Sequence, residues 1–316
     1  MAQISTPGSC SPTHIPVLLK EALHYLAPVA GGIYIDGTLG LGGHAEKILQ
    51  ACAPSGLVIG FEWDEQALEL ARKKLASYGS RFQALHRSYS EIMAGLAELR
   101  ISRVDGLLLD LGVSSLQFDS GERGFSYQAE GPLDMRMDKR MHLSAEDIIN
   151  DFSQEELADI FYYYGEEKQA RRIAAQIAAK RVKERITTTT QLSRIIAAAV
   201  PRKFQPKKIH VATKVFQALR IAVNKELENL AALLDSLTKI LNPEGRVCII
   251  SFHSLEDRLV KRKFKENPEL HILTKKPVRP EADEIKTNPR SRSAKLRAAY
   301  IKSGEPGGPY NAERLL

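Results

Sequence analysis

Over its first third, the chain alternates short apolar runs with amphipathic segments. The apolar runs occupy residues 33–36, 56–62, 82–86 and 104–110. The segments between them, residues 45–52, 65–78 and 90–99, place apolar side chains at helical spacing. This alternation predicts βαβ units, and therefore a parallel sheet with helices on both faces. Because the strand runs are almost continuously apolar, we expect both faces of the sheet to be covered.

The alternation stops after Gly112, and the next strand pattern, residues 246–252, follows an Asn-Pro-Glu-Gly turn. The intervening stretch is far longer than one crossover needs and is rich in helix formers. We therefore predict an α/β sheet domain that an all-helical domain interrupts. The predicted divisions are a flexible tail over 1–12, a sheet domain over 13–125 and 213–316, and an inserted helical domain over 126–212. Helices are predicted over 159–186, 191–200 and 213–241, and late strands over 271–274 and 296–301.

A glycine-rich turn links the first predicted strand to a helix, which is the arrangement of a nucleotide-cofactor cradle. The turn reads Asp36-Gly-Thr-Leu-Gly-Leu-Gly-Gly-His44, and Glu62 ends the second strand, where an acid can bind ribose hydroxyls. Asp36 would repel the pyrophosphate of a dinucleotide, whereas S-adenosylmethionine carries an ammonium and a sulfonium. The loop favours a methyltransferase over a dinucleotide oxidoreductase, and a plain glycine turn is the structural alternative.

Asp110 ends the fourth predicted strand, and ligands bind at this end of open α/β sheets. In amino-group methyltransferases an acceptor here holds the N–H of a poor nucleophile and orients its lone pair. The alternative is that Asp110 caps the next turn or contacts the cofactor. The Pro-Pro-aromatic sequence common after such an acid is absent, so a stacking aromatic must come from elsewhere. The candidates are Phe125, Tyr127 and Phe252.

Composition adds a partner class and a compartment. The net charge of +7 and the pI of about 9.2 favour a polyanionic partner, although a solvated basic surface explains them equally well. The three cysteines form no C-x-x-C pair, so we expect neither a disulfide framework nor a metal site. Without a signal-peptide pattern or an apolar run of about 20 residues, we expect a soluble, cytoplasmic protein with no membrane partner.

Seven sequence strings resemble one known family, the bacterial 16S ribosomal RNA cytosine-N4 methyltransferases (MraW or RsmH). They are His-Ile-Pro-Val-Leu at 14–18, the glycine loop at 36–44, Asp-Leu-Gly-Val-Ser-Ser at 110–115, Glu-Arg-Gly-Phe-Ser at 122–126, Gly-Pro-Leu-Asp-Met-Arg-Met-Asp at 131–138, Ser-Phe-His-Ser-Leu-Glu-Asp-Arg at 251–258, and the basic string at 288–297. The similarity extends over nearly the whole chain.

The resemblance implies a Rossmann-like class I methyltransferase sheet and an inserted helical domain that binds substrate. It implies methyl transfer from S-adenosylmethionine to a cytosine N4 in the decoding region of 16S ribosomal RNA, within the small ribosomal subunit. The implied cofactor residues, together with Asp36 from the loop, are Gly42, Gly43, His44, Glu62, Tyr89, Asp110 and Gln117. Glu62 stands where the family usually has Asp.

The catalytic candidates are Asp110, Asp134, Asp138 and His253. Asp134 and Asp138 could accept a proton, or Arg136 could be held in a structural pair. His253 is expected near the base pocket, although a lone histidine more often satisfies a hydrogen bond.

Three basic clusters offer phosphate contacts: residues 261–265, residues 290–297, and the cations between 171 and 185. Two other functions remain open. A DNA amino-methyltransferase would share the cofactor loop, and a non-catalytic ribosome assembly factor would retain the fold without turnover.

Overall fold

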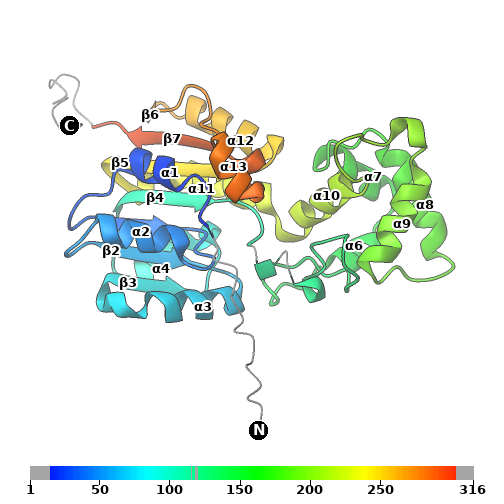
Figure 1. Cartoon of the computed structure of the whole chain (residues 1–316), viewed down its shortest axis with the longest axis horizontal. Coiled ribbons are helices and arrows are strands. Elements are labelled where there is room, and N and C mark those ends of the chain that lie inside the picture. The colour runs from blue at the N-terminus through cyan, green and yellow to red at the C-terminus, as the bar shows by residue number, and fades with distance from the viewer. Residues whose placement is uncertain (1–14, 115, 118–119, 304–316) are drawn as a thin grey trace, which may run out of the picture.

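The computed structural model describes residues 15–114, 116–117 and 120–303. The tail predicted over residues 1–12 lies outside these residues, as do His14 and Ser115 of the quoted strings. A sheet flanked by helices forms one part of the molecule, and a separate group of helices lies beside it (Figure 1). This arrangement matches the predicted α/β class with a helical insertion.

Within the residues that the structure describes, the sheet has seven strands in the order β3-β2-β1-β4-β5-β7-β6. The strands are β1 (Ile33–Asp36), β2 (Leu57–Phe61), β3 (Phe82–Leu85), β4 (Val104–Asp110), β5 (Leu241–Ser251), β6 (Leu270–Ile272) and β7 (Lys295–Ile301). Strands β1 to β5 pair in parallel, while β7 is antiparallel to β5 and β6. The chain order reverses beside β1, so the carboxyl ends of β1 and β4 flank a crevice where α/β sheets bind ligands.

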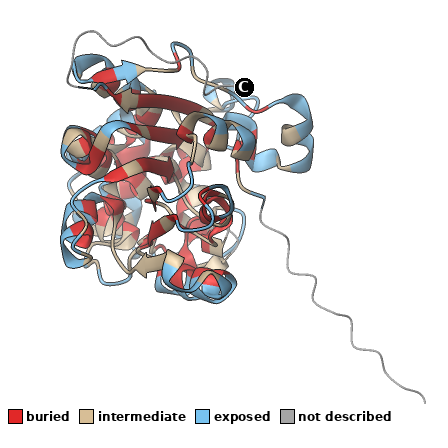
Figure 2. Ribbon diagram, turned by 90° about the vertical axis from the view of Figure 1, so that its left-hand side faces the viewer, coloured by how far each residue is buried: buried red, intermediate tan, exposed pale blue. Residues whose placement is uncertain are grey.

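Apolar clusters cover both faces of the sheet, as the continuous apolar strands predicted. Side chains alternate along β4, so that Leu107 and Leu109 join one cluster and Leu108 joins the other. Helices α4 (Ile92–Glu98), α11 (Glu226–Ile240) and α12 (Ser254–Glu266) pack on the first face. Helices α1 (Leu19–Leu26), α2 (Gly43–Ala51) and α3 (Glu65–Leu75) pack on the second. Figure 2 shows the resulting buried strands between helices with exposed outer surfaces.

Short elements complete the sheet domain. They are η1 (Ala76–Arg81), η2 (Tyr89–Glu91), α13 (Ala282–Thr287) and η5 (Pro289–Ser293). Within the described residues, no helix is both long enough and apolar enough to cross a bilayer.

The helical insertion has its own apolar cluster, which extends from Phe125 to Val223. Its elements are η3 (Gly121–Arg123), α6 (Ala145–Asp151), α7 (Gln154–Tyr163), α8 (Ala170–Arg181), α9 (Thr189–Ala199), η4 (Arg202–Phe204) and α10 (Thr213–Asn224). Ser144, Ser153 and Thr188 begin α6, α7 and α9 with capping boxes, so these starts are encoded locally.

Two long helices predicted from the pattern are each broken in the structure. The stretch over 159–186 contains the end of α7 and all of α8, which are separated by a turn with Glu166 at φ 49°. The stretch over 213–241 is α10 and α11, separated at Lys225, which adopts φ 50°. Val215 packs in the helical cluster, whereas Leu230 packs on the sheet. The apolar stripe continues across the break because both helices bury one face, each in a different core.

Candidate active site

The carboxyl ends of β1, β2 and β4 open into a cleft of about 970 Å³, and α10 and α11 supply part of its lining. Six of the predicted cofactor residues line it: Gly43, His44, Glu62, Tyr89, Asp110 and Gln117. Asp36 and Gly42 do not line the cleft. The sequence strings therefore meet in one site, with these two residues placed behind its surface.

The glycine loop leaves β1 and curves against α3. Gly42 has φ 75°, and a side chain there would also stand 2.9 Å from Leu75 of α3. Glycine at position 42 therefore serves the turn and its close packing, which explains why it does not line the cleft. Gly43 begins α2 at the cleft surface.

Glu62 connects the end of β2 to this loop. Its carboxylate accepts hydrogen bonds from the backbone N–H of Gly40 at 2.7 Å and of Asp64 at 2.9 Å. Burial raises the pKa of Glu62 to about 7. The side chain is thus a fixed acceptor at the cleft, in the position where α/β cofactor sites bind ribose hydroxyls.

Asp36 acts one layer below the surface. Its carboxylate accepts a hydrogen bond from the backbone N–H of Thr38 at 3.2 Å, and the Thr38 hydroxyl accepts one from the N–H of Asp110 at 2.6 Å. Burial raises the pKa of Asp36 to about 7. Through Thr38, Asp36 therefore helps to hold the end of β1 against the end of β4. The loop pattern predicted that Asp36 points into the cleft, and in the structure it does not.

Asp110 lies at the end of β4 with its side chain 18% exposed. Its Oδ1 atom is buried and has no hydrogen-bond partner among the residues that the structure describes, and its Oδ2 lies 3.8 Å from Nδ1 of His44. Burial, with the nearby charges of Asp36 and Glu256, raises the pKa of Asp110 well above its ordinary value. A buried acceptor without a partner is costly unless a ligand satisfies it.

An aromatic wall stands beside Glu62. Tyr89 is buried, and its hydroxyl donates to the backbone carbonyl of Glu226 at 3.3 Å. Its ring centroid lies 6.0 Å from that of Trp63, and both residues line the cleft. A flat heterocycle fits such a wall. Trp63 carried no role in the sequence analysis, although it directly follows Glu62.

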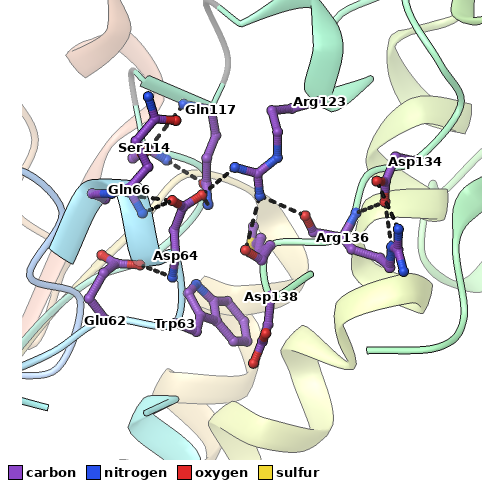
Figure 3. Close-up of polar contacts among 12 residues, drawn as sticks. Glu62, Trp63, Asp64, Gln66, Ser114, Gln117, Arg123, Asp134, Arg136 and Asp138 are labelled. Carbon is purple, nitrogen blue, oxygen red and sulfur yellow. Dashed lines mark hydrogen bonds and ion pairs between the residues drawn. The ribbon is translucent and has the colours of Figure 1, made fainter. Parts of the chain in front are cut away.

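Gln117 reaches the cleft through a buried polar network (Figure 3). Its amide donates to Asp64 at 3.0 Å, and its oxygen accepts from the N–H of Ser114 at 3.1 Å. Asp64 is also the N-cap of α3, and its carboxylate accepts a hydrogen bond from the guanidinium of Arg123. Arg123 belongs to one of the resembling strings, but only the fold brings it to Asp64.

Comparison with known proteins points to one family. A model of the MraW methylase family matches residues 11–302. The Ribosomal RNA small subunit methyltransferase H of Desulfotalea psychrophila is 57% identical over 286 residues, which cover 90% of this chain and 97% of the relative. The protein of the same name from Halothermothrix orenii is 50% identical over 304 residues, covering 90% and 97%.

This chain belongs to the MraW methylase family. The resemblance found in the sequence is confirmed, and S-adenosylmethionine is the methyl donor. The cleft residues fit that donor. Glu62 and Asp110 line the cleft and Asp36 lies behind it, and a nearby positive charge favours the ionised form of such carboxyl groups, so the site suits a cationic ligand and opposes a phosphate.

One wall of the MraW-family cleft contains a buried ion pair that local sequence did not reveal. Arg220 of α10 donates to the Glu226 carboxylate at 2.8 and 2.9 Å. Glu256 of α12 also lines this wall. Although burial alone would raise the pKa of Glu256, His253 and Arg220 hold it below its ordinary value. These residues lie far apart in the sequence, and the domain arrangement brings them together.

His253 begins α12 instead of facing the cleft. Its Nδ1 accepts from the N–H of Glu256 at 3.4 Å, and its Nε2 lies 3.1 Å from the Glu256 carboxylate. Asp134 and Asp138 form ion pairs with Arg136 and Arg140, each at 2.7 Å. None of the three lines the cleft, whereas Met137, between the two aspartates, does.

Some of the aromatic and basic candidates line the cleft, whereas others pack within the fold. Phe252 lines the cleft, whereas Phe125 and Tyr127 belong to the helical cluster. In the carboxyl-terminal basic string, Lys295 and Arg297 pair with Asp257 at 3.2 and 2.7 Å, so these two cations support the fold. Arg290 of the same string lines the cleft.

Proposed function

We propose that this chain transfers a methyl group from S-adenosylmethionine to the exocyclic N4 of a cytosine in 16S ribosomal RNA, in the decoding region of the small subunit. The observation that carries the proposal is the Oδ1 atom of Asp110 at the end of β4, a buried acceptor for which the described residues provide no hydrogen-bond partner. The names of the two relatives, both small-subunit ribosomal RNA methyltransferases, support small-subunit ribosomal RNA as the substrate. The cytosine and its position rest on the resemblance of the sequence strings.

The proposed mechanism uses the side chains around Asp110. When bound, S-adenosylmethionine supplies a methyl group on a positively charged sulfur. Glu62, Tyr89 and Gln117 would hold the donor. Asp110 would accept an N–H of the target amino group and orient its lone pair toward the methyl group. Phe252 would stack on the unpaired base.

Asp110 is also one of two possible acceptors of the reaction proton, the other being water. Burial raises its pKa and so favours the neutral carboxyl, while positive charge beside it favours the carboxylate. As the N4–methyl bond forms, the amino nitrogen carries one proton too many. An ionised Asp110, or water, would then take that proton. His253 would act as a positioning residue because its Nδ1 caps α12, and Asp134 and Asp138 because each forms an ion pair with an arginine.

The test is transfer of tritium from labelled S-adenosylmethionine to three substrates. These are small ribosomal subunits from cells without the endogenous activity, naked 16S ribosomal RNA, and duplex DNA. Product nucleosides are identified by mass spectrometry. We expect N4-methylcytidine from the subunits or the naked RNA. Label in duplex DNA alone would replace the proposal with the DNA methyltransferase alternative. A thermal shift with S-adenosylhomocysteine but no transfer would favour the assembly factor.

A further inference from the structure

An exposed basic loop joins α9 to α10. It comprises residues 201–210, and its cations are Arg202, Lys203, Lys207 and Lys208. All four are exposed, and none forms an ion pair with an acid among the described residues. The basic loop does not line the cleft and has no part in the chemistry proposed above.

The surrounding sequence is unusual in its charge. From Arg185 to Lys225 the chain contains nine Lys or Arg residues and no Asp or Glu. Uninterrupted like charge disfavours the folded state unless an anion offsets it. By contrast, Arg185 at the start of this stretch pairs with Glu146 and Asp151, and Lys263 of α12 pairs with Asp235. The four loop cations thus differ from cations that support the fold.

The basic loop also exposes apolar side chains. Phe204 is 53% exposed and Ile209 is 40% exposed. The Lys203 ammonium lies 4.9 Å from the centroid of the Phe204 ring. Exposed aromatic rings among unpaired cations are characteristic of surfaces that bind single-stranded nucleic acid, where bases stack and cations contact phosphates.

Anchors at both ends hold the basic loop in place. The Gln205 amide donates to the carbonyl of Val200 at 2.9 Å. The His210 ring stacks on Tyr127 with centroids 4.7 Å apart, and Tyr127 hydrogen-bonds to Thr213 at 3.1 Å. Arg202 and Lys203 lie between Val200 and Gln205, and Lys207 and Lys208 lie between Gln205 and His210, so these contacts fix the backbone on both sides of each pair of cations.

Helix α10 connects the basic loop to the cleft. It begins at Thr213, directly after the loop, and carries Arg220 in the cleft wall. The helical rise places these two residues roughly 10 Å apart along the axis. A strand with one nucleotide in the cleft would contact the basic loop by running along α10 with its neighbouring nucleotides.

We propose that the basic loop binds the RNA strand next to the target nucleotide, with phosphates on its four cations and an unpaired base on Phe204. The inference rests on the proposed function and deepens it, because it names the surface that holds the substrate. It favours single-stranded RNA over duplex, since stacking on Phe204 needs an unpaired base.

The first experiment replaces Arg202, Lys203, Lys207 and Lys208 by alanine in the full chain. A matched control removes the same charge from four exposed lysines of the sheet domain, Lys20, Lys73, Lys239 and Lys276. Binding of a fluorescent single-stranded fragment of the 16S decoding region is measured at several salt concentrations. Methyl transfer to small subunits is measured in parallel, with thermal unfolding as a check on folding.

We expect the loop variant to lower the slope of log affinity against log salt by about 3, since each phosphate that is no longer neutralised on a single strand lowers it by about 0.7. Its KM for subunits should rise at least tenfold while kcat stays within twofold. The control should change the slope by less than one. If the loop variant and the control behave alike, the basic loop is not the RNA surface.

A second variant separates stacking from charge. Phe204→Ala should weaken single-stranded binding by about 5- to 100-fold without altering the salt slope, and Phe204→Trp should restore binding. Equal affinity of Phe204→Ala and the wild type would overturn the stacking role. If the wild type itself neither binds nor methylates subunits, the proposed function fails first. If it does both and the loop variant matches it, only the loop inference fails.

Discussion

Arg123 places one edge of its guanidinium on the buried Asp64 carboxylate, and the same guanidinium donates to the backbone carbonyls of Arg136 and Met137 (Figure 3). Asp64 is the N-cap of α3 and lies two residues after Glu62, while Met137 belongs to the insertion and lines the cleft. The Arg123 side chain therefore joins the segment from Glu62 to Asp64 in the sheet domain to a loop of the inserted domain. Although burial alone would raise the pKa of Asp64, Gln117 and Arg123 hold it below its ordinary value.

Removing Arg123 should damage both stability and cofactor binding. Arg123→Ala leaves Asp64 buried without its cation, and breaking such a pair costs about 3–5 kcal/mol of unfolding free energy. Cofactor affinity should also fall, because Met137 and Gln117 lose their supports. Urea unfolding and calorimetric titration with S-adenosylmethionine measure the two effects.

Arg140 provides the matched control, because it pairs with Asp138 in the same segment while its side chain is 57% exposed. Arg140→Ala should cost less than about 1 kcal/mol and leave cofactor affinity unchanged. Equal losses from the two variants would show that the Asp64 contact has no special role.

The buried carboxyls of Asp36 and Glu62 should make stability fall as pH rises. Burial raises both pKa values to about 7, from ordinary values of 3.8 and 4.5. At a pH between the ordinary pKa values and about 7, the folded chain retains protons that the unfolded chain has released. The unfolding free energy therefore decreases as pH rises through this range and levels off above about pH 7. Asp36→Asn should reduce this slope in urea unfolding from about pH 5 to 8.

The exposed Asp283, whose side chain is 90% exposed, serves as the control for that experiment. Asp283→Asn should leave the slope unchanged. An Asp36→Asn slope identical to that of the wild type would contradict a raised pKa at Asp36.

Asp110 should govern the rate of transfer more than cofactor binding. Asp110→Ala removes the acceptor for the amino group, and we expect kcat to fall about 100- to 10,000-fold. Asp110→Asn retains one carbonyl oxygen and should lose less. Single-turnover transfer to small subunits measures the rate, and the thermal shift with S-adenosylhomocysteine measures cofactor binding. A loss of that shift in proportion to the loss of rate would assign Asp110 to the cofactor alone.

His253 offers a test of its positioning role. As the N-cap of α12 it accepts from the N–H of Glu256. His253→Asn keeps a capping acceptor, so stability and rate should stay close to the wild type, whereas His253→Ala should cost about 1 kcal/mol. Thermal unfolding and transfer assays compare the two. If His253→Asn is stable but inactive, the imidazole takes part in the chemistry directly.

Sequence alone determined the α/β class, the parallel strands and the position of the glycine loop. These features depend on local pattern, since an apolar run ending in Asp36 or Glu62 signals a strand end wherever the strand lies. Gly43, Glu62, Tyr89 and Asp110 line the cleft as predicted because each belongs to the end of a strand or the loop after it.

Tertiary structure alone decided which side chains face the cleft and which face each other. The apolar stripe over 213–241 did not reveal the break at Lys225, because helices in two different cores each bury one face at the same spacing. No local pattern pairs Asp64 with Arg123 or brings Arg220 to the same cleft as Asp110, since both arrangements depend on how the insertion packs on the sheet. Burial has the same origin, and it is burial that raises the pKa of Asp36, Glu62 and Asp110.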